Sequence, residues 1–201
     1  GMFAARLGVY AVAAHFLPIE PADPRTRVAR PMLRESLSPG ALSDGHVACY
    51  FRDANGQAAV EFALQAGVPV RCFSAPRLQI PGAACFGFDV DRFTESLRSC
   101  AAIIGSSGSN LCAEAVMLGK PILALHRRGD SEQQLNGLLL ARAGIGMTAE
   151  FDRLRVETIR EFLRRAAAGS FRRVDLTAAL PDTVTAVLQT LDDVAARLGP
   201  V

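Results

Sequence analysis

The chain has 201 residues, of which 50% are hydrophobic, and a formal net charge of +2. This length suits one α/β domain with an appendage rather than two full domains. So balanced a charge argues against nucleic acid or a membrane surface as the binding partner, because both attract proteins with a strong excess of positive charge.

The cysteines and the apolar runs indicate where the protein resides. The five cysteines are odd in number, stand in apolar runs and form no Cys-x-x-Cys pair, as is typical of buried thiols in a reducing compartment and not of a structural zinc site. The apolar run 7–19 is too short to span a bilayer and contains His15. We therefore expect a cytoplasmic protein without a transmembrane segment, and we interpret Gly1 and Met2 as a tag remnant before a start codon.

Residues 1–45 predict an N-terminal arm or linker. Residues 7–16 are apolar enough for one strand, but prolines and arginines then interrupt any regular pattern. These are Pro18, Pro21, Pro24 and Pro31 with Arg25, Arg27, Arg30 and Arg34. We interpret the arginines as solvated, with a partner surface as the less favoured alternative.

Residues 46–201 predict the domain proper. Apolar runs typical of buried parallel strands alternate with segments of helical periodicity. The expected strands are 46–51, 68–73 and 83–88; Asp53 or Asn55 caps a helix that ends at Gly67, and Asp91 caps the next helix. Amphipathic helices are expected at 156–166 and 184–198.

Residues 101–125 predict a strand, a Gly/Ser loop, a helix and a second, parallel strand. Glu114 is the only ionisable side chain between residues 101 and 119, in a helix that is apolar on nearly every side. Ahead of it, the loop 105–109 can bring bare backbone close to a ligand, and the first N–H groups of the helix carry the positive end of its dipole. This pattern favours a phosphate site with a carboxylate one turn behind it.

Structural interpretations of the same residues stay open. Ser109 or Asn110 can be a simple helix cap, and Glu114 can be satisfied by a backbone N–H or by an arginine from elsewhere. Gly/Ser turns before helices are common, so the loop alone does not decide between these interpretations and a phosphate site.

The segment 126–136 carries further polar side chains. Ser131 and Gln134 fit a capping box, which gives Gln134 a structural role. Glu132, Gln133 and Asn136 have no such role, and their spacing places them on one face of the helix. Because the carboxyl ends of parallel strands share one edge of a sheet, we expect this segment and the Gly/Ser loop to be neighbours at a ligand site.

Asp89 and Asp91 suggest a metal site, because paired carboxylates one residue apart occur in metal-dependent sugar transferases. A helix-capping role is sufficient for Asp91, and the pair precedes a helix rather than an exposed hairpin. We therefore expect no metal site, and no cofactor.

Four stretches resemble the donor-binding, C-terminal half of two-domain (GT-B) glycosyltransferases, in particular the peptidoglycan N-acetylglucosaminyltransferase and the plant-type UDP-sugar transferases. They are 108–114 (GSNLCAE), 118–121 (LGKP), 132–136 (EQQLN) and 143–146 (AGIG). The resemblance implies a Rossmann-like three-layer α/β domain with a mainly parallel sheet. It also implies metal-independent, inverting transfer from a UDP-sugar or another nucleotide-sugar donor.

The resemblance assigns the donor diphosphate to residues 108–110, the ribose to Glu114 and the transferred sugar to Glu132 with Gln133. The full expected site comprises Gly108, Ser109, Asn110, Glu114, His126, Arg127, Glu132, Gln133 and Asn136. The catalytic base stays unidentified. His126 is the one histidine at this edge, and we expect it to contact the diphosphate or the sugar rather than to deprotonate an acceptor.

The sequence departs from the family pattern at three points. The histidine that often precedes the glycine in the plant-type pattern is Ser106 or Ser107 here, and Glu132 replaces the usual aspartate. In those families an N-terminal domain binds the acceptor and often supplies the base, whereas this chain has room for about one domain. We therefore expect either a truncated piece or one subunit of a split transferase whose partner binds the acceptor.

Two other functions stay open on the same residues. One is a nucleotide-sugar epimerase or hydrolase of the same fold, and the other is a non-catalytic donor-binding subunit. In the resembled fold the C-terminal helix crosses toward the second domain, although the pattern of residues 184–198 is equally compatible with packing on its own sheet.

Overall fold

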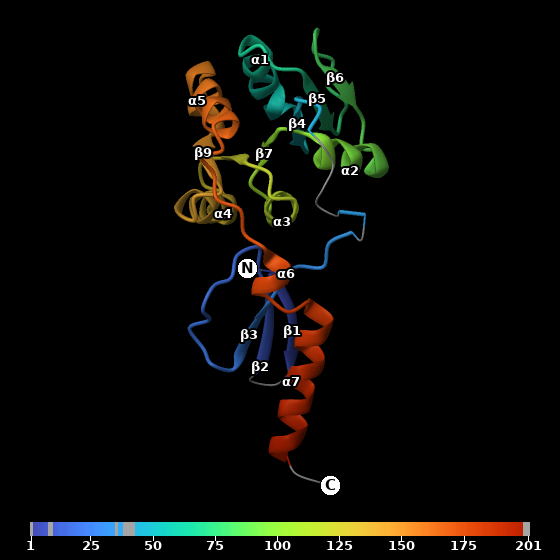
Figure 1. The fold of residues 1–201 in the computed structure, drawn as a ribbon, viewed down its shortest axis with the longest axis vertical. Coiled ribbons are helices and arrows are strands. Elements are labelled where there is room, and N and C mark those ends of the chain that lie inside the picture. The colour runs from blue at the N-terminus through green and yellow to red at the C-terminus, as the bar shows by residue number, and fades with distance from the viewer. Residues whose placement is uncertain (1, 8–9, 35, 38–42, 199–201) are drawn as a thin grey trace.

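The computed structural model describes residues 2–7, 10–34, 36–37 and 43–198. Its strands form two separate sheets, one of six strands in the order β6-β5-β4-β7-β8-β9 and one of three strands in the order β1-β2-β3 (Figure 1). The larger sheet and its helices make up the upper part of the view in Figure 1, and the smaller sheet makes up the lower part.

The larger sheet is parallel throughout. Its strands are β4 (Val47–Phe51), β5 (Val70–Ser74), β6 (Ala84–Phe86), β7 (Ala102–Ser106), β8 (Ile122–His126) and β9 (Gly146–Glu150). The first five confirm the expected strands. Strand β9 was not predicted, because only its first residue is buried and its sequence, GMTAE, lacks both alternation and an apolar run.

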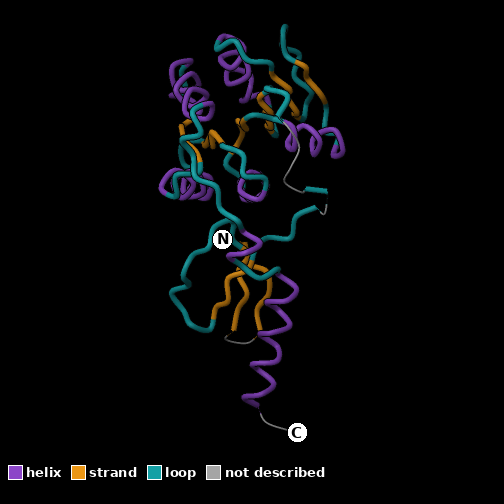
Figure 2. The backbone as a smooth tube through the Cα atoms, in the orientation of Figure 1, coloured by secondary structure: helices purple, strands orange, loops and turns teal. Residues whose placement is uncertain are grey.

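Helices cover both faces of this sheet, so the expected three-layer α/β fold is confirmed (Figure 2). The helices are α1 (Gln57–Gln65), α2 (Val90–Ser99), α3 (Ser109–Met117), α4 (Ser131–Arg142) and α5 (Val156–Ala167), with short 3-10 turns η1 (Ala54–Gly56) and η2 (Phe151–Arg153). Buried residues of α1 and α5 pack on one face, and those of α2, α3 and α4 on the other. The apolar character of α3 on nearly every side follows from its place against β7, β8 and α4.

Two expected helix caps are wrong. Asp89 rather than Asp91 caps α2, and Asp130 rather than a Ser131–Gln134 box caps α4. In each helix the capping carboxylate accepts a hydrogen bond of 3.0 Å from the main-chain N–H three residues further on. Each cap lies one or two residues before the expected one, since the helix begins at the residue that directly follows the aspartate.

The smaller sheet corrects the expectation of an arm or linker at residues 1–45. Strands β1 (Met2–Leu7), β2 (Tyr10–Ala14) and β3 (Thr26–Ala29) pair with each other, β1 antiparallel and β3 parallel to β2. The prolines that argued against regular structure lie between β2 and β3 or after β3, where they bound the strands instead of interrupting them. The expected division of the chain at residue 45 stays a prediction.

The C-terminal helix α7 (Thr183–Leu198) packs on the smaller sheet and not on the larger one. Ala186 is buried against Val12 and Ala29, and Arg27 forms an ion pair with Asp193. A short helix, α6 (Leu176–Ala179), precedes it. The chain therefore returns at its end to the sheet that its first residues build (Figure 1).

The segment between β3 and β4 is held to the larger unit by its apolar residues. Leu37 is buried, and Leu33 packs beside it, in the same hydrophobic cluster as Phe93 of α2 and Leu111 of α3.

Among the described residues, no helix combines the length and the hydrophobicity that crossing a bilayer needs.

Candidate ligand-binding site

A cavity of about 490 Å³ lies at the carboxyl ends of β4 and β7, beside the start of α3. Arg34, Tyr50, Arg52, Phe88, Phe93, Ser106, Gly108, Ser109, Asn110, Leu111, Glu114, Asp130, Glu132 and Gln133 line it. Ligands of open parallel sheets bind at this edge of the sheet. Its volume lies within the range of cavities that hold small molecules and cofactors.

Six of the nine expected site residues line this cavity, and three do not. The six are Gly108, Ser109, Asn110, Glu114, Glu132 and Gln133. His126, Arg127 and Asn136 lie outside it. The cavity also has residues that the sequence did not single out as site residues, and these include Arg34, Tyr50, Arg52, Phe88 and Phe93.

The start of α3 faces the cavity without a capping side chain. Gly108 is the N-cap residue, and its backbone is extended, with φ −66° and ψ 144°. Neither Ser109 nor Asn110 therefore has the capping role considered for it. The first N–H groups of a helix lack partners within the helix, and the helix dipole is positive at this end. The cavity therefore has main-chain donors suited to an anion.

Two buried polar side chains fix the loop ahead of α3. The hydroxyl of Ser107 lies 3.0 Å from the main-chain oxygen of Leu125 and 2.8 Å from that of Gln133. Asn136 is buried, and its side-chain amide donates a hydrogen bond of 2.9 Å to the main-chain oxygen of Ser107. Asn136 thus supports the loop from behind instead of lining the cavity.

Glu114 is 6% exposed and lines the cavity one turn into α3. Its carboxylate forms an ion pair with Arg34, whose other terminal nitrogen donates a hydrogen bond of 3.0 Å to the hydroxyl of Thr94. Burial raises the pKa of Glu114 above its usual value, and the hydrogen bond and charge of Arg34 oppose that rise. Of the alternatives open at the sequence level, an arginine from elsewhere is the partner found.

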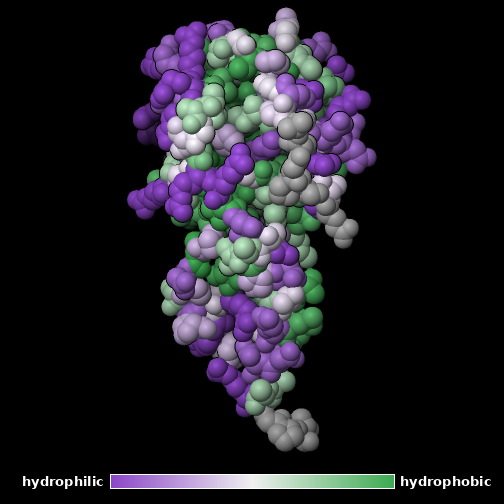
Figure 3. Space-filling model, viewed as in Figure 1, coloured by the Kyte–Doolittle hydropathy of each residue, from purple (hydrophilic) through white to green (hydrophobic). Residues whose placement is uncertain are grey.

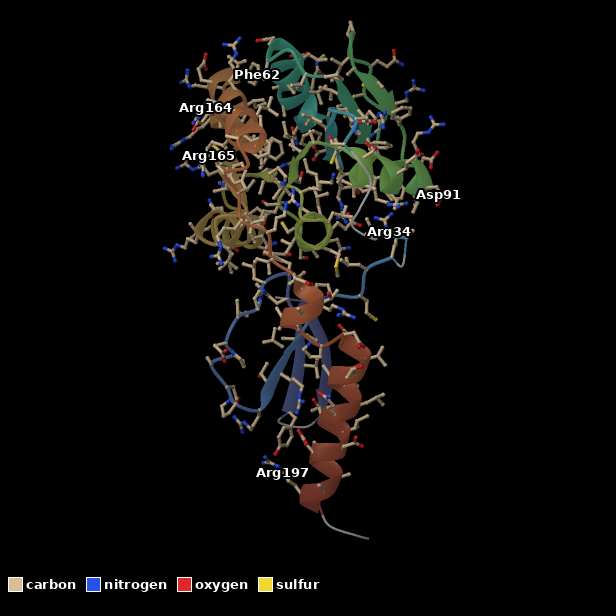
Figure 4. All side chains as sticks on the ribbon, in the orientation of Figure 1. Arg34, Phe62, Asp91, Arg164, Arg165 and Arg197 are labelled. Carbon is tan, nitrogen blue, oxygen red and sulfur yellow. The ribbon has the colours of Figure 1, made fainter. Side chains whose placement is uncertain are left out.

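Arg34 corrects the interpretation that the arginines of residues 25–34 are solvated. It extends from the connecting segment toward α2 (Figure 4), where its guanidinium lies 5.8 Å from the centre of the Phe93 ring. Arg34 and Glu114 are 80 positions apart in the chain. No local sequence pattern indicates an ion pair between residues so far apart, so the sequence could not identify Arg34 as the partner of Glu114.

Aromatic side chains form one wall of the cavity. The ring centre of Tyr50 lies 5.0 Å from that of Phe93 and 6.4 Å from that of Phe88. Phe88 is 61% exposed although it is large and apolar. The sequence placed Phe88 in the expected strand 83–88, whereas β6 ends at Phe86, so no local pattern indicated this wall.

The start of α4 forms the opposite wall, where Asp130, Glu132 and Gln133 lie. The Asp130 carboxylate is occupied by the helix cap. Gln133 has a buried side-chain oxygen without a hydrogen-bond partner in the described part of the chain. Glu132 and Gln133 place on this wall a carboxylate and an amide, which can accept hydrogen bonds from hydroxyl groups.

His126 is the last residue of β8 and Arg127 follows it, and both lie on the same edge of the sheet but outside the cavity lining. Arg127 forms an ion pair with Asp53, which follows β4. The Nδ1 atom of His126 is buried and lacks a partner among the residues described. The structure thus brings neither residue into the group that surrounds Glu114.

Metal-ligating and nucleophilic groups do not gather at the cavity. Within the described ranges, no group of three His, Cys, Asp or Glu residues is arranged to hold a metal ion. Asp89 caps α2, and its neighbour Asp91 is exposed at the start of that helix (Figure 4). Burial raises the pKa of the Cys112 thiol to about 12, so this cysteine of α3 is a core side chain and not a nucleophile.

The six-stranded parallel sheet, with helices on both faces and a cavity at the carboxyl ends of its strands, defines a Rossmann-like α/β domain. Residues 4–167 match the sequence profile described as Glycosyl transferase family 1, and the chain belongs to this family. A search of curated protein sequences found no match.

Solved glycosyltransferase structures share the fold. Spinosyn forosaminyltransferase SpnP is 17% identical with a TM-score of 0.62, over 92% of this chain and 55% of its own. Spinosyn rhamnosyltransferase SpnG complexed with thymidine diphosphate is 19% identical with a TM-score of 0.63, over 93% and 57%. The calicheamicin glycosyltransferase CalG4 is 17% identical with a TM-score of 0.58, over 98% and 54%.

These comparisons confirm the expected glycosyltransferase family and the expected fold, which is that of one half of a GT-B structure. The chain spans about half the length of the solved structures it resembles. At identities below 20% the structural likeness supports the fold alone, so ligand and activity have to be argued from the cavity.

Proposed function

We propose that this chain is the donor-binding half of a glycosyltransferase and that its cavity holds a nucleoside-diphosphate sugar. The observation that carries this proposal is the meeting of three groups in one cavity: the uncapped start of α3, the carboxylate of Glu114 and the side chains of Glu132 and Gln133. The first group suits a diphosphate, and the other two suit the hydroxyl groups of two sugars.

The donor diphosphate lies in this proposal against the main-chain N–H groups at residues 108–110. Glu114 follows one turn later and accepts hydrogen bonds from the ribose hydroxyls. Glu132 and Gln133, on the opposite wall, bind the transferred sugar. These are the assignments that the family resemblance implied, and the cavity brings the same residues together.

The reaction we propose is an inverting displacement at the anomeric carbon. The bond from that carbon to the diphosphate oxygen breaks as the bond to an acceptor oxygen forms, and the acceptor's proton passes to a base on the other half of the enzyme. The departing diphosphate gains negative charge, which the N–H groups and the dipole of α3 stabilise in place.

The nucleotide we propose is UDP, as the resemblance implied. The structure of SpnG includes thymidine diphosphate, so the deoxy nucleotide is the alternative to test. UDP has a 2′-hydroxyl that thymidine diphosphate lacks, and a carboxylate at Glu114 can accept from both ribose hydroxyls. A preference for UDP is therefore expected to depend on Glu114.

The acceptor site belongs in this proposal to the other half of a GT-B fold, as a further domain or a separate subunit. Helix α7 supports this because, beyond the face it packs on the smaller sheet, it exposes Val184, Leu188 and Leu191 at helical spacing. Hydrophobic side chains reach the surface in the lower part of Figure 3, where α7 lies. An apolar stripe on a helix is suited to packing against a second domain.

Binding of UDP is expected without any divalent metal, because the positive end of α3 and the guanidinium of Arg52 in the cavity supply the charge that a diphosphate requires. Calorimetric titration with UDP and with thymidine diphosphate, in the presence of a chelator, measures this. Binding that requires added Mg²⁺ or Mn²⁺ would count against the assignment.

The chain alone is expected to bind donor but to transfer no sugar, and to release UDP from UDP-sugars no faster than buffer does. The residues that line the cavity include no histidine, and Glu132 is assigned to the sugar. Assay of free UDP over a panel of UDP-sugars tests this. Sustained turnover that is abolished by His126→Ala would favour the hydrolase or epimerase alternative, and binding without turnover even with an acceptor half present would favour the binding subunit.

A further inference from the structure

Arg34 lies outside the larger sheet, yet its side chain lines the candidate site and reaches Glu114. Its guanidinium pairs with Glu114, donates to Thr94 and lies over the ring of Phe93. The chain on either side of it is anchored, since Leu33 and Leu37 pack in the cluster that includes Phe93. Arg34 is therefore held where it meets Glu114, and it is not a surface side chain that happens to lie nearby.

Arg34 opposes the effect of burial on the pKa of Glu114. A carboxylate that is 6% exposed loses most of its hydration, and burial is the largest influence on its pKa, which is raised. Arg34 is the charged group that opposes the rise. The other charged side chains around the cavity are Arg52 beyond β4 and Asp130 and Glu132 of α4; the two carboxylates disfavour a further negative charge, and Arg52 favours it.

The hydrogen bonds leave room for a ligand. Arg34 contacts the Oε1 atom of Glu114, and Oε2 has no hydrogen-bond partner in the part of the chain that is described. An ionised carboxylate offers about four acceptor positions, so one oxygen can hold the arginine while the other accepts from hydroxyl groups. A protonated carboxyl would present a donor at one of these positions.

We propose that Arg34 is a positioning residue of the nucleotide site: it fixes one carboxylate oxygen of Glu114 and keeps the group ionised, so that the other oxygen binds the ligand's hydroxyls. This rests on the proposed function. The site is then built by two parts of the chain, the larger sheet with α3 and the segment that joins it to the smaller sheet. Without Arg34, burial would raise the pKa of this glutamate without an opposing positive charge from the arginine.

A blocking role for Arg34 is the competing explanation, and the geometry disfavours it. The guanidinium has five N–H groups, of which two are used, and the Arg34 side chain is 34% exposed. A lock on the site would occupy both carboxylate oxygens. Arg34 can instead stay paired with Glu114 while the ligand binds.

The test compares UDP affinity of the full chain with that of Arg34→Met, Arg34→Lys and the control Arg25→Met, an exposed arginine that pairs with Asp23. At neutral pH, Arg34→Met is expected to weaken UDP binding by about tenfold or more, the loss typical of a charge-assisted hydrogen bond. Arg34→Lys is expected to restore much of the affinity, and Arg25→Met to leave it unchanged.

The pH profile separates positioning from direct contact. Without Arg34 the pKa of Glu114 is expected to rise further, so the loss of UDP affinity in Arg34→Met is expected to become smaller as the pH is raised and Glu114 ionises. In a Glu114→Gln background, which also corrects for titration of the nucleotide itself, Arg34→Met is expected to cause no further loss. A carbon-13 NMR titration of the Glu114 carboxyl without nucleotide should show a higher pKa in Arg34→Met than in the parent.

Each contrary result has its own meaning. Equal losses from Arg34→Met in the parent and in the Glu114→Gln background, with no recovery at higher pH, would assign Arg34 to direct contact with the phosphates and overturn the positioning role. Tighter binding by Arg34→Met would establish the blocking role instead. If the parent chain binds neither UDP nor thymidine diphosphate, the proposed function is wrong and this inference is wrong with it. If the parent binds UDP and Arg34→Met binds it equally well, only the inference is wrong.

Discussion

Glu114→Ala is expected to weaken UDP binding by roughly 1–3 kcal/mol, the range for hydrogen bonds to a charged group, while the chain stays folded. The carboxylate lies one turn behind the start of α3 and lines the cavity. Its loss removes an acceptor for the ribose hydroxyls and leaves Arg34 without its ion-pair partner. Calorimetric titration of the variant and the parent at the same pH measures the change.

Two further variants make this result interpretable. Glu114→Gln keeps the shape of the side chain and removes its charge, and it should lose nearly as much affinity as alanine if the charge matters. Glu157→Ala changes an exposed glutamate of α5 and should change nothing. A Glu114→Ala protein that melts at a lower temperature without ligand, but binds UDP as tightly per folded molecule as the parent, would identify Glu114 as a structural carboxylate.

The fold was predictable from the sequence wherever the pattern is strong and local. Apolar runs of strand length, most of them followed by a helical segment, identified five strands of the larger sheet, because a strand buried on both faces is mostly apolar. Strand β9 lies at the edge of that sheet and is half-buried, so its composition carries no such constraint. The three strands of the smaller sheet are short and rich in alanine, which left the prolines between them as the dominant signal.

The part of the site that lies just after two strands of the larger sheet was predictable from the sequence. Residues 108–114 and 132–133 each follow a parallel strand directly, so the rule that such segments share one edge brought them together in advance. Arg34 and the aromatic wall come from other parts of the chain, and their role depends on packing that no local pattern encodes. Asn136 shows the opposite error, since a polar residue on the correct helix face supports the loop from behind.

The stretch AGIG at residues 143–146 is one of the four stretches that resemble the glycosyltransferase family, and in the structure its glycines have a packing role. Gly144 has φ +72°, a conformation that glycine adopts easily, where α4 ends. Gly146 begins β9 directly opposite Ile122 of β8. A Cβ added there would overlap the carbonyl oxygen of Ile122 and lie 3.0 Å from its Cγ2 atom. The close approach of these two strands therefore requires glycine.

Gly146→Ala is accordingly expected to lower the free energy of unfolding by about 1–3 kcal/mol, the usual cost of overpacking. The obstacle is a backbone atom of the neighbouring strand, so β9 has to move away from β8 and cannot relieve the overlap by a rotamer change. In a chain of this size such a loss lowers the melting temperature by roughly 2–12 °C.

Gly87→Ala is the matched control, because a Cβ at Gly87 meets no atom within 4 Å and its φ is not in the positive region that disfavours alanine. There the substitution restricts the unfolded chain and should be neutral or raise stability by up to about 1 kcal/mol. Thermal and chemical unfolding of the parent and the two variants measures both effects. Equal melting temperatures for Gly146→Ala and Gly87→Ala would show that β9 yields freely at this point. Helix α4 packs on β9 and carries Glu132 and Gln133 at its start, so a freely moving β9 would also loosen these two residues. The UDP affinity of the same variants therefore shows whether the edge strand is needed to hold the sugar-binding wall in place.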